Sequence, residues 1–111
     1  MTLLNDIHDN VFREYRSYIE ETETSRSVGD CVVLYGKHDI TERNTTYEVQ
    51  VYLPGWVAIG DDSGGSAILI RLDGSDGVYR CGHGALGSVD PELIADSFAN
   101  WLADGCPIAD D

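Results

Sequence analysis

The central part of the chain contains short apolar segments that alternate with turn-forming residues. Between Cys31 and Cys81, each apolar run ends at a cluster of Gly, Asp, Ser or Pro. This spacing is typical of strands joined by tight turns, because it leaves little room for the helix that a parallel crossover needs. The sequence therefore predicts an antiparallel sheet in which strands that are neighbours in the chain pair with each other.

Five segments are the candidate strands of this sheet. They are residues 31–35, 46–53, 56–59, 67–72 and 78–81. The 46–53 segment alternates apolar and polar side chains, which indicates a strand with one buried face. Residues 22–30 and 37–44 are polar and have no apolar periodicity, so we expect them to form loops.

Helices are predicted near the two ends of the chain. Apolar residues at three- and four-residue spacing over residues 3–21 form the stripe of an amphipathic helix. Asp90 and Pro91 favour the start of a second helix over residues 91–103. Because both helices and the 67–72 strand need a shared core, we expect one α+β domain over residues 1–111. Its architecture would be a single antiparallel sheet of four to six strands with both helices on one face.

The chain carries a large excess of acidic residues. Twenty Asp and Glu against seven Lys and Arg give a formal net charge of −13 over 111 residues. A surface with this charge repels phosphate backbones and anionic membranes, and it attracts basic proteins. We therefore expect a protein partner and neither nucleic acid nor a membrane.

Cysteine usage favours a reducing compartment. Cys31, Cys81 and Cys106 are an odd number without C-x-x-C spacing, whereas a disulfide scaffold needs a denser, even set. The first residues lack the basic start and apolar run of a signal peptide, and the apolar run at 51–60 is too short to span a bilayer. We expect free thiols and a cytoplasmic protein.

Several segments resemble motifs of catalytic or cofactor sites without meeting their chemical needs. Residues 82–87 match G-x-G-x-x-G, but the predicted helix begins only after Asp90, where a carboxylate replaces the phosphate. Residues 60–65 resemble the segment around a protease serine, yet the chain is too short for that two-barrel fold. Cys81 and His83 supply one weak pair where zinc needs three or four ligands. We expect no enzymatic activity, no metal and no cofactor.

Three segments of the second half occur in an order that points to a known family. They are PGWVAIGDDSGG at 54–65, GVY at 77–79 and ADSFANWL at 95–102. In this order they resemble the SUKH superfamily, which includes the Smi/Knr regulators of yeast cell-wall synthesis and bacterial toxin-immunity proteins. Members usually carry a longer segment, with a second helix, where this chain has only residues 22–30.

The resemblance implies a non-enzymatic domain that binds and neutralises a specific toxin. In many bacterial members the toxin attacks nucleic acid, so it needs a basic groove that an acidic partner can fill. The alternative is an intracellular scaffold or regulator of the Smi/Knr type, which binds a host protein and has no toxin partner. A toxin gene beside this one would favour the first interpretation. In isolation we expect a monomer or a weak homodimer.

The candidate binding residues are four aspartates and two aromatic side chains: Asp61, Asp62, Asp73, Asp76, Tyr52 and Trp56. The aspartates lie in two turns that flank the 67–72 strand, ~20 Å apart at the usual rise per residue. With the aromatic side chains between them they would form an elongated patch with a charged rim. The alternative is that these aspartates only shape and solvate their turns. In the first case, reversing the charge of Asp61 and Asp62 is expected to slow association with a basic partner, most strongly at low salt.

Overall fold

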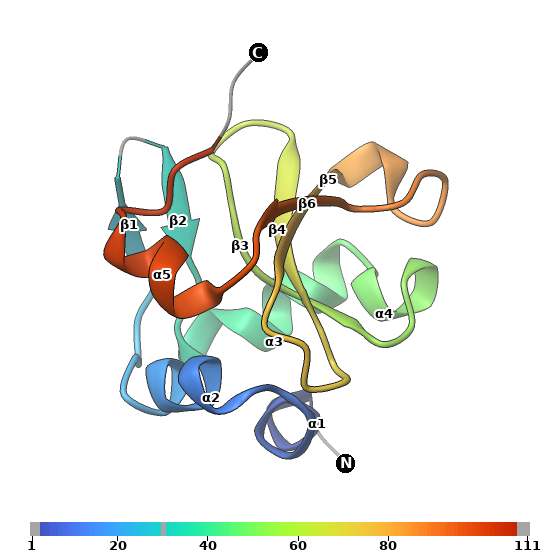
Figure 1. Cartoon of the computed structure of the whole chain (residues 1–111). Helices are drawn as coiled ribbons and strands as arrows, with labels where there is room; N and C mark the ends of the chain where they lie inside the picture. The colour runs from blue at the N-terminus through green and yellow to red at the C-terminus, as the bar shows by residue number, and fades with distance from the viewer. Residues whose placement is uncertain (1–2, 30, 109–111) are drawn as a thin grey trace.

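Six strands form one antiparallel sheet in which every strand pairs with its neighbours in the sequence (Figure 1). The structure is a computed structural model that describes residues 3–29 and 31–108. The strands are β1 (Arg26–Val28), β2 (Val32–Leu34), β3 (Trp56–Asp61), β4 (Ser66–Arg71), β5 (Val78–Gly82) and β6 (Glu92–Ala95). The predicted class is confirmed: the fold is α+β, with one antiparallel sheet and helices at both ends.

The centre of the sheet is the pair β3 and β4. Residues 57–60 and 67–70 are all buried, so both faces of these strands are covered by other parts of the chain. Gly60 lies against β2 so closely that a Cβ atom there would be 2.3 Å from the carbonyl oxygen of Val33. Only glycine therefore allows β2 to approach β3 at this position.

The N-terminal helix is divided into two, contrary to the prediction of one helix over residues 3–21. Helix α1 (Leu3–Asn10) ends before Val11, and α2 (Arg13–Glu20) follows Phe12, which has an extended backbone. Val11 and Phe12 are both buried at this break. The Arg16 guanidinium donates hydrogen bonds to the carbonyl oxygens of His8 and Val11, both at 2.7 Å, so it replaces the lost helical partners.

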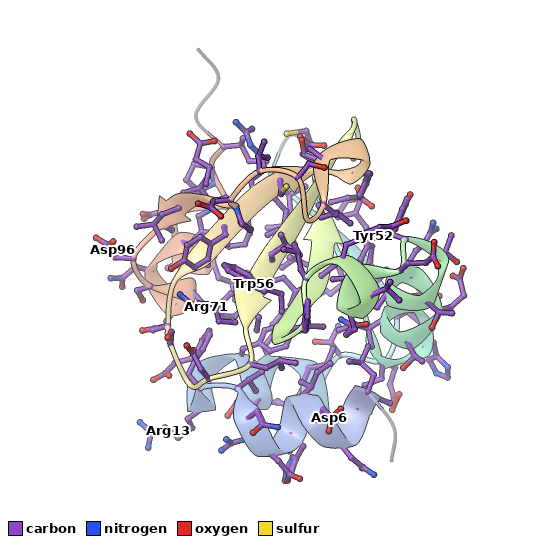
Figure 2. The ribbon with its side chains drawn as sticks, turned by 90° about the vertical axis from the view of Figure 1, so that its right-hand side faces the viewer. Asp6, Arg13, Tyr52, Trp56, Arg71 and Asp96 are labelled. Atoms are coloured by element: carbon purple, nitrogen blue, oxygen red, sulfur yellow. The ribbon has the colours of Figure 1, made fainter. Side chains whose placement is uncertain are left out.

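Two further helices occupy segments that were predicted as a loop and a strand. Helix α3 (Lys37–Thr46) replaces the expected loop at 37–44, and α4 (Val49–Tyr52) replaces the expected strand at 46–53. Val49 is buried but Val51 is 70% exposed, so burial does not follow the alternation that suggested a strand. In Figure 2, these helices and the β6–α5 segment lie on opposite sides of the central strands.

The C-terminal helix begins later than predicted, because residues 92–95 form β6 and extend the sheet beside β5. Helix α5 (Phe98–Ala103) starts after Ser97, whose Oγ accepts a hydrogen bond from the backbone N–H of Asn100 at 3.2 Å. Ser97, and not Asp90, is therefore the N-cap. The predicted loop at 22–30 contains β1, while Asp30 lies outside the described residues.

Helices α2 and α5 pack on each other through aromatic side chains. The Phe98 ring meets the Tyr15 ring edge-on at 5.2 Å and lies 6.3 Å from the Trp101 ring. Tyr15, Phe98 and Trp101 belong to the same buried cluster as the residues of β4. The shared core that we predicted for the terminal helices and this strand is confirmed.

The three thiols are free and differ in burial. Cys31 is exposed, whereas Cys81 and Cys106 are buried. Burial raises the pKa of the Cys106 thiol to about 11 and also raises the pKa of Cys81. The thiolate is the reactive form of cysteine. We therefore expect Cys31 to react rapidly with a disulfide reagent at about pH 8, and Cys81 and Cys106 to react only when the protein unfolds.

The rates are measured by absorbance with and without denaturant. The variant Cys31→Ser should remove the rapid phase and leave the slow phases unchanged. A rapid reaction of two or three thiols in the folded protein would contradict the burial of Cys81 and Cys106.

Candidate protein-binding surface

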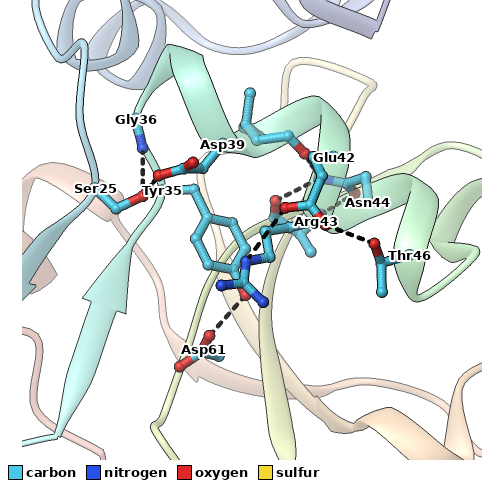
Figure 3. A network of polar contacts seen from close by, with 11 residues as sticks. Ser25, Tyr35, Gly36, Asp39, Glu42, Arg43, Asn44, Thr46 and Asp61 are labelled. Carbon is cyan, nitrogen blue, oxygen red and sulfur yellow. Dashed lines mark hydrogen bonds and ion pairs between the residues drawn. The ribbon is translucent and has the colours of Figure 1, made fainter.

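The turn between β3 and β4 is shaped by the carboxylates of Asp61 and Asp62. Oδ1 of Asp61 accepts a hydrogen bond from the N–H of Ser63, and Oδ1 of Asp62 accepts one from Gly64, both at 2.9 Å. The second oxygen of Asp61 accepts a hydrogen bond from the Tyr35 hydroxyl at 2.7 Å (Figure 3). Both carboxylates are thus fixed in position by the turn that they stabilise.

The turn between β4 and β5 uses Asp73 and Asp76 in the same way. Asp73 accepts a hydrogen bond from the N–H of Ser75 at 2.9 Å and pairs with the Arg71 guanidinium at 3.3 Å. These contacts, the hydrogen bonds from Ser75 first, lower the pKa of Asp73. Asp76 accepts a hydrogen bond from the N–H of Phe98 at 3.2 Å and so ties the turn to α5.

The six candidate residues fall into two groups at opposite ends of the β3–β4 pair. Asp61 is paired with Ala67 at one end and Trp56 with Arg71 at the other. Trp56 therefore lies near Asp73, and not midway between the two acidic turns as the elongated patch required. At the usual rise of a strand, Asp61 and Asp62 are ~20 Å from this group. The structure brings Trp56 together with the Asp73 turn through Arg71, whereas Tyr52 lies on α4, against Gly87.

The ring of Trp56 is half-buried by two neighbours on the same face of the sheet. The Tyr79 ring lies edge-on at 4.8 Å, and the Arg71 guanidinium lies over the indole at 5.2 Å (Figure 2). Arg71 in turn is paired with Asp73. This arrangement fixes the indole in one orientation and leaves part of it accessible, which is a property of anchor residues in protein interfaces.

Leu93 of β6 continues this aromatic group across the sheet. Its side chain and that of Tyr79 both approach Gly77, where a Cβ atom would lie 3.1 Å from each. On the other side of Trp56, Tyr52 of α4 lies against Gly87, where a Cβ would be 3.2 Å from that of Tyr52. Residues 52–56 link Tyr52 to Trp56 along the chain, and residues 89–93 link Val89 to Leu93.

The most exposed large apolar side chains lie on α4, on β6 and in the connection that precedes β6. Among the described residues, they are Val51, Tyr52, Val89 and Leu93, each at least 50% exposed. We define the apolar surface as Tyr52, Trp56, Tyr79, Val89 and Leu93. Neighbouring carboxylates include Asp73 at the end of β4 and Glu92, which pairs with Arg80 at 3.6 Å. An apolar centre with charged neighbours is the usual anatomy of a specific protein interface.

Sequence reasoning identified Tyr52 and Trp56 but missed Val89 and Leu93 as parts of this surface. Leu93 was placed in a helix, so its side chain was not expected beside β5. The sequence did contain a sign of this exposure. Val89 and Leu93 lie on either side of Asp90 and Pro91, and charged residues and proline are mostly exposed in folded proteins.

The segments that resemble cofactor motifs have structural roles. Gly87, the last glycine of the G-x-G-x-x-G match, has φ +80 and lies beside Tyr52, and α5 begins only at Phe98. The imidazole of His83 stacks flat on the Tyr47 ring at 4.0 Å. Residues 3–29 and 31–108 contain no cluster of three His, Cys, Asp or Glu side chains that could hold a metal ion.

The SMI1 / KNR4 family (SUKH-1) matches residues 5–104. The chain belongs to this family. The match includes most of α1, all of α2, the whole sheet and α5, so it extends well beyond the three segments that first indicated the resemblance. No curated protein matches the chain. Within the described residues, no helix combines the length and the apolar content that a membrane crossing requires.

Proposed function

We propose that this SUKH-1 domain is an immunity protein, which binds a cognate basic toxin through the apolar surface and neutralises it without catalysis. The observation that carries the proposal is the half-buried Trp56 ring, with Tyr79 and the exposed Leu93 continuing it across the sheet, on a strongly acidic molecule. A nucleic-acid-targeting toxin carries a basic groove for phosphates, and an acidic domain that fills this groove excludes the substrate. We place the complex in the cytoplasm.

The turn carboxylates would contribute mainly to the rate of association. Asp62 and Asp73 are held by backbone N–H groups, so they present fixed negative charge without first becoming ordered. Fixed charges of one sign steer an oppositely charged partner and act most strongly at low ionic strength. Apolar contacts at Tyr52, Trp56 and Leu93 would then determine how slowly the complex dissociates.

The first test is genetic. The toxin to be used is the product of a gene adjacent to this one. Its expression alone should arrest growth, and co-expression of this domain should restore growth. If no neighbouring product is toxic, or if the toxicity persists with the domain present, the immunity function is wrong. The scaffold or regulator of the Smi/Knr type would then be the better interpretation.

The second test measures association with that toxin. In the double variant Asp62→Asn, Asp73→Asn, each asparagine keeps the oxygen that accepts the turn hydrogen bond but loses its charge. We expect the association rate constant to fall about three- to tenfold at low salt, with a smaller effect at high salt. The rates are measured by stopped-flow fluorescence.

The matched control is Asp6→Asn, Asp9→Asn, which makes the same change in net charge on α1, a helix that contributes no residue to the apolar surface (Figure 2). The control should change the rate less than twofold. Equal effects of the two double variants would mean that net charge alone steers the partner. The Asp62 and Asp73 turns would then have no special part in the interface.

A further inference from the structure

Strand β6 is an open edge of the sheet, and its exposed side runs into a groove. Within the described residues β6 pairs only with β5, and its first two residues are exposed. The groove has a volume of about 280 Å³ and begins at Ile94 and Ala95. We propose that the partner adds a basic, extended segment to β6 as a seventh strand and inserts an Arg or Lys side chain into this groove.

The groove is lined by both polar and apolar residues, a combination that fits a long cationic side chain. Its lining includes the carboxylates of Asp96 and Asp104, the Asn100 side chain and the ring of Trp101. Asp96 and Asp104 are exposed, and neither forms an ion pair with another described residue. The Trp101 indole donates a hydrogen bond to the carbonyl oxygen of Pro107 at 2.9 Å, which holds this part of the lining in place. The aliphatic part of an Arg or Lys can pack on the apolar residues while its charge meets the carboxylates.

Charge distinguishes this edge from the opposite edge of the sheet. β6 is flanked by Asp90 and Asp96 and begins with Glu92, whereas β1 begins with Arg26. Like charges keep two acidic edges apart, so β6 is protected from pairing with β6 of another copy. A basic segment removes this repulsion. The edge is therefore selective for a basic strand.

Strand β6 is only four residues long, so a partner strand that pairs with its backbone also needs contacts with side chains. Pro91 precedes β6 and has no N–H to donate, and the register with β5 shifts between Leu93 and Ala95. Four residues offer few backbone hydrogen bonds, and added strands gain specificity from pockets for alternate side chains. Leu93 also belongs to the apolar surface, so one partner strand would contact that surface and the groove together.

This inference rests on the proposed function only in taking the partner to be basic, and a peptide can test it without the toxin. The probe is a nine-residue peptide of alternating Arg and Val with blocked ends. Its control has the same sequence with every backbone nitrogen methylated, which keeps the charge but removes all the N–H donors that a strand needs for pairing. Binding to the full chain is measured by amide NMR shifts at several salt concentrations.

We expect shifts of residues 92–97 with the first peptide and at least about fivefold weaker binding of the methylated one. The double variant Asp96→Asn, Asp104→Asn should weaken binding about five- to tenfold at low salt, while Asp6→Asn, Asp9→Asn should change it less than twofold. Asn retains the shape of both side chains, and unchanged shifts elsewhere would verify the fold.

Equal binding of the two peptides would overturn strand addition, because charge alone would then explain the complex. Shifts confined to residues away from β6 would overturn the choice of edge. A dimer of the chain whose interface contains residues 92–97 would assign the edge to a second copy of the chain instead. Peptide binding at β6 without toxin neutralisation would disprove only the proposed function. Neutralisation unaffected by the Asp96 and Asp104 changes, without binding of the peptide, would disprove only this inference.

Discussion

Replacing Trp101 with alanine is expected to lower the free energy of unfolding by about 3–5 kcal/mol. The side chain is 2% exposed, and its ring lies beside Phe98 in the cluster that joins α5 to α2. The substitution leaves a cavity the size of an indole and removes the hydrogen bond to Pro107. Equilibrium unfolding in urea, followed by circular dichroism, measures the change.

Two further variants serve as comparisons, one at Trp101 itself and one at an exposed aromatic residue. Trp101→Phe keeps most of the ring but loses the indole N–H, so it should cost less than the alanine change by about 2 kcal/mol. Tyr52→Ala removes an aromatic side chain that is 51% exposed and should cost below about 1 kcal/mol. If Trp101→Ala leaves the midpoint unchanged, α5 is not anchored by this residue.

Strands β2 to β5 were predictable because each is specified by its own local pattern, whereas β1 and β6 were missed. β4 is a continuous apolar run between two turns rich in Gly and Asp, and β3 and β5 have the same kind of boundaries. Pairing of neighbours in the sequence then follows from the short connections. Local information was therefore sufficient for the centre of the sheet.

The helices were harder to predict because their boundaries depend on contacts between distant residues. Helix α3 buries only Ile40 and Asn44, so it shows almost no apolar stripe. The break between α1 and α2 is stabilised by Arg16, which binds carbonyl oxygens of the preceding helix. Near the C-terminus, Asp90 was predicted to begin the helix, but residues 92–95 pair with β5, so the helix begins only after Ser97.

The candidate surface was predictable only where local sequence determines the structure. Asp61 and Asp73 could be placed in turns from their Gly and Ser neighbours, and the structure shows them accepting the backbone hydrogen bonds of these turns. The position of Trp56 beside Arg71 depends on the register of β3 and β4, which a sequence does not state directly. Leu93 could join the surface only once β6 was known to be a strand.

Asn44 completes the sheet where β2 ends. Strand β2 pairs with β3 only at residues 60 and 61, so Ala58, which pairs with Leu69 of β4 on one side, has no strand beside it on the other. The carboxamide of Asn44 supplies both missing partners, because it accepts from the N–H of Ala58 and donates to its carbonyl oxygen, each at 2.9 Å. Gln50 donates to Asn44 at 3.0 Å and to the carbonyl oxygen of Trp56 at 2.8 Å. This buried pairing gives α3 its position against the sheet.

Asn44→Ala is therefore expected to lower the free energy of unfolding by about 2–5 kcal/mol, since two buried backbone groups of Ala58 would each lose a partner at about 1–3 kcal/mol. Asn44 is 1% exposed, so water has no access to replace the carboxamide. Asn44→Leu restores the lost volume and should remain destabilising, because the polar groups and not the cavity dominate. Urea unfolding measures both variants.

The chain offers a matched control in Asn10. Its carboxamide donates to the carbonyl oxygen of Asp6 at 2.9 Å, four residues earlier, as that of Asn44 does to Ile40 at 2.8 Å. Asn10 is exposed, so water can replace its hydrogen bond, and Asn10→Ala should cost below about 0.5 kcal/mol. The difference between the two alanine variants isolates the contacts with Ala58. If the two costs are equal, the edge of β3 is satisfied in another way, and the position of α3 depends on Ile40 and Val49 alone.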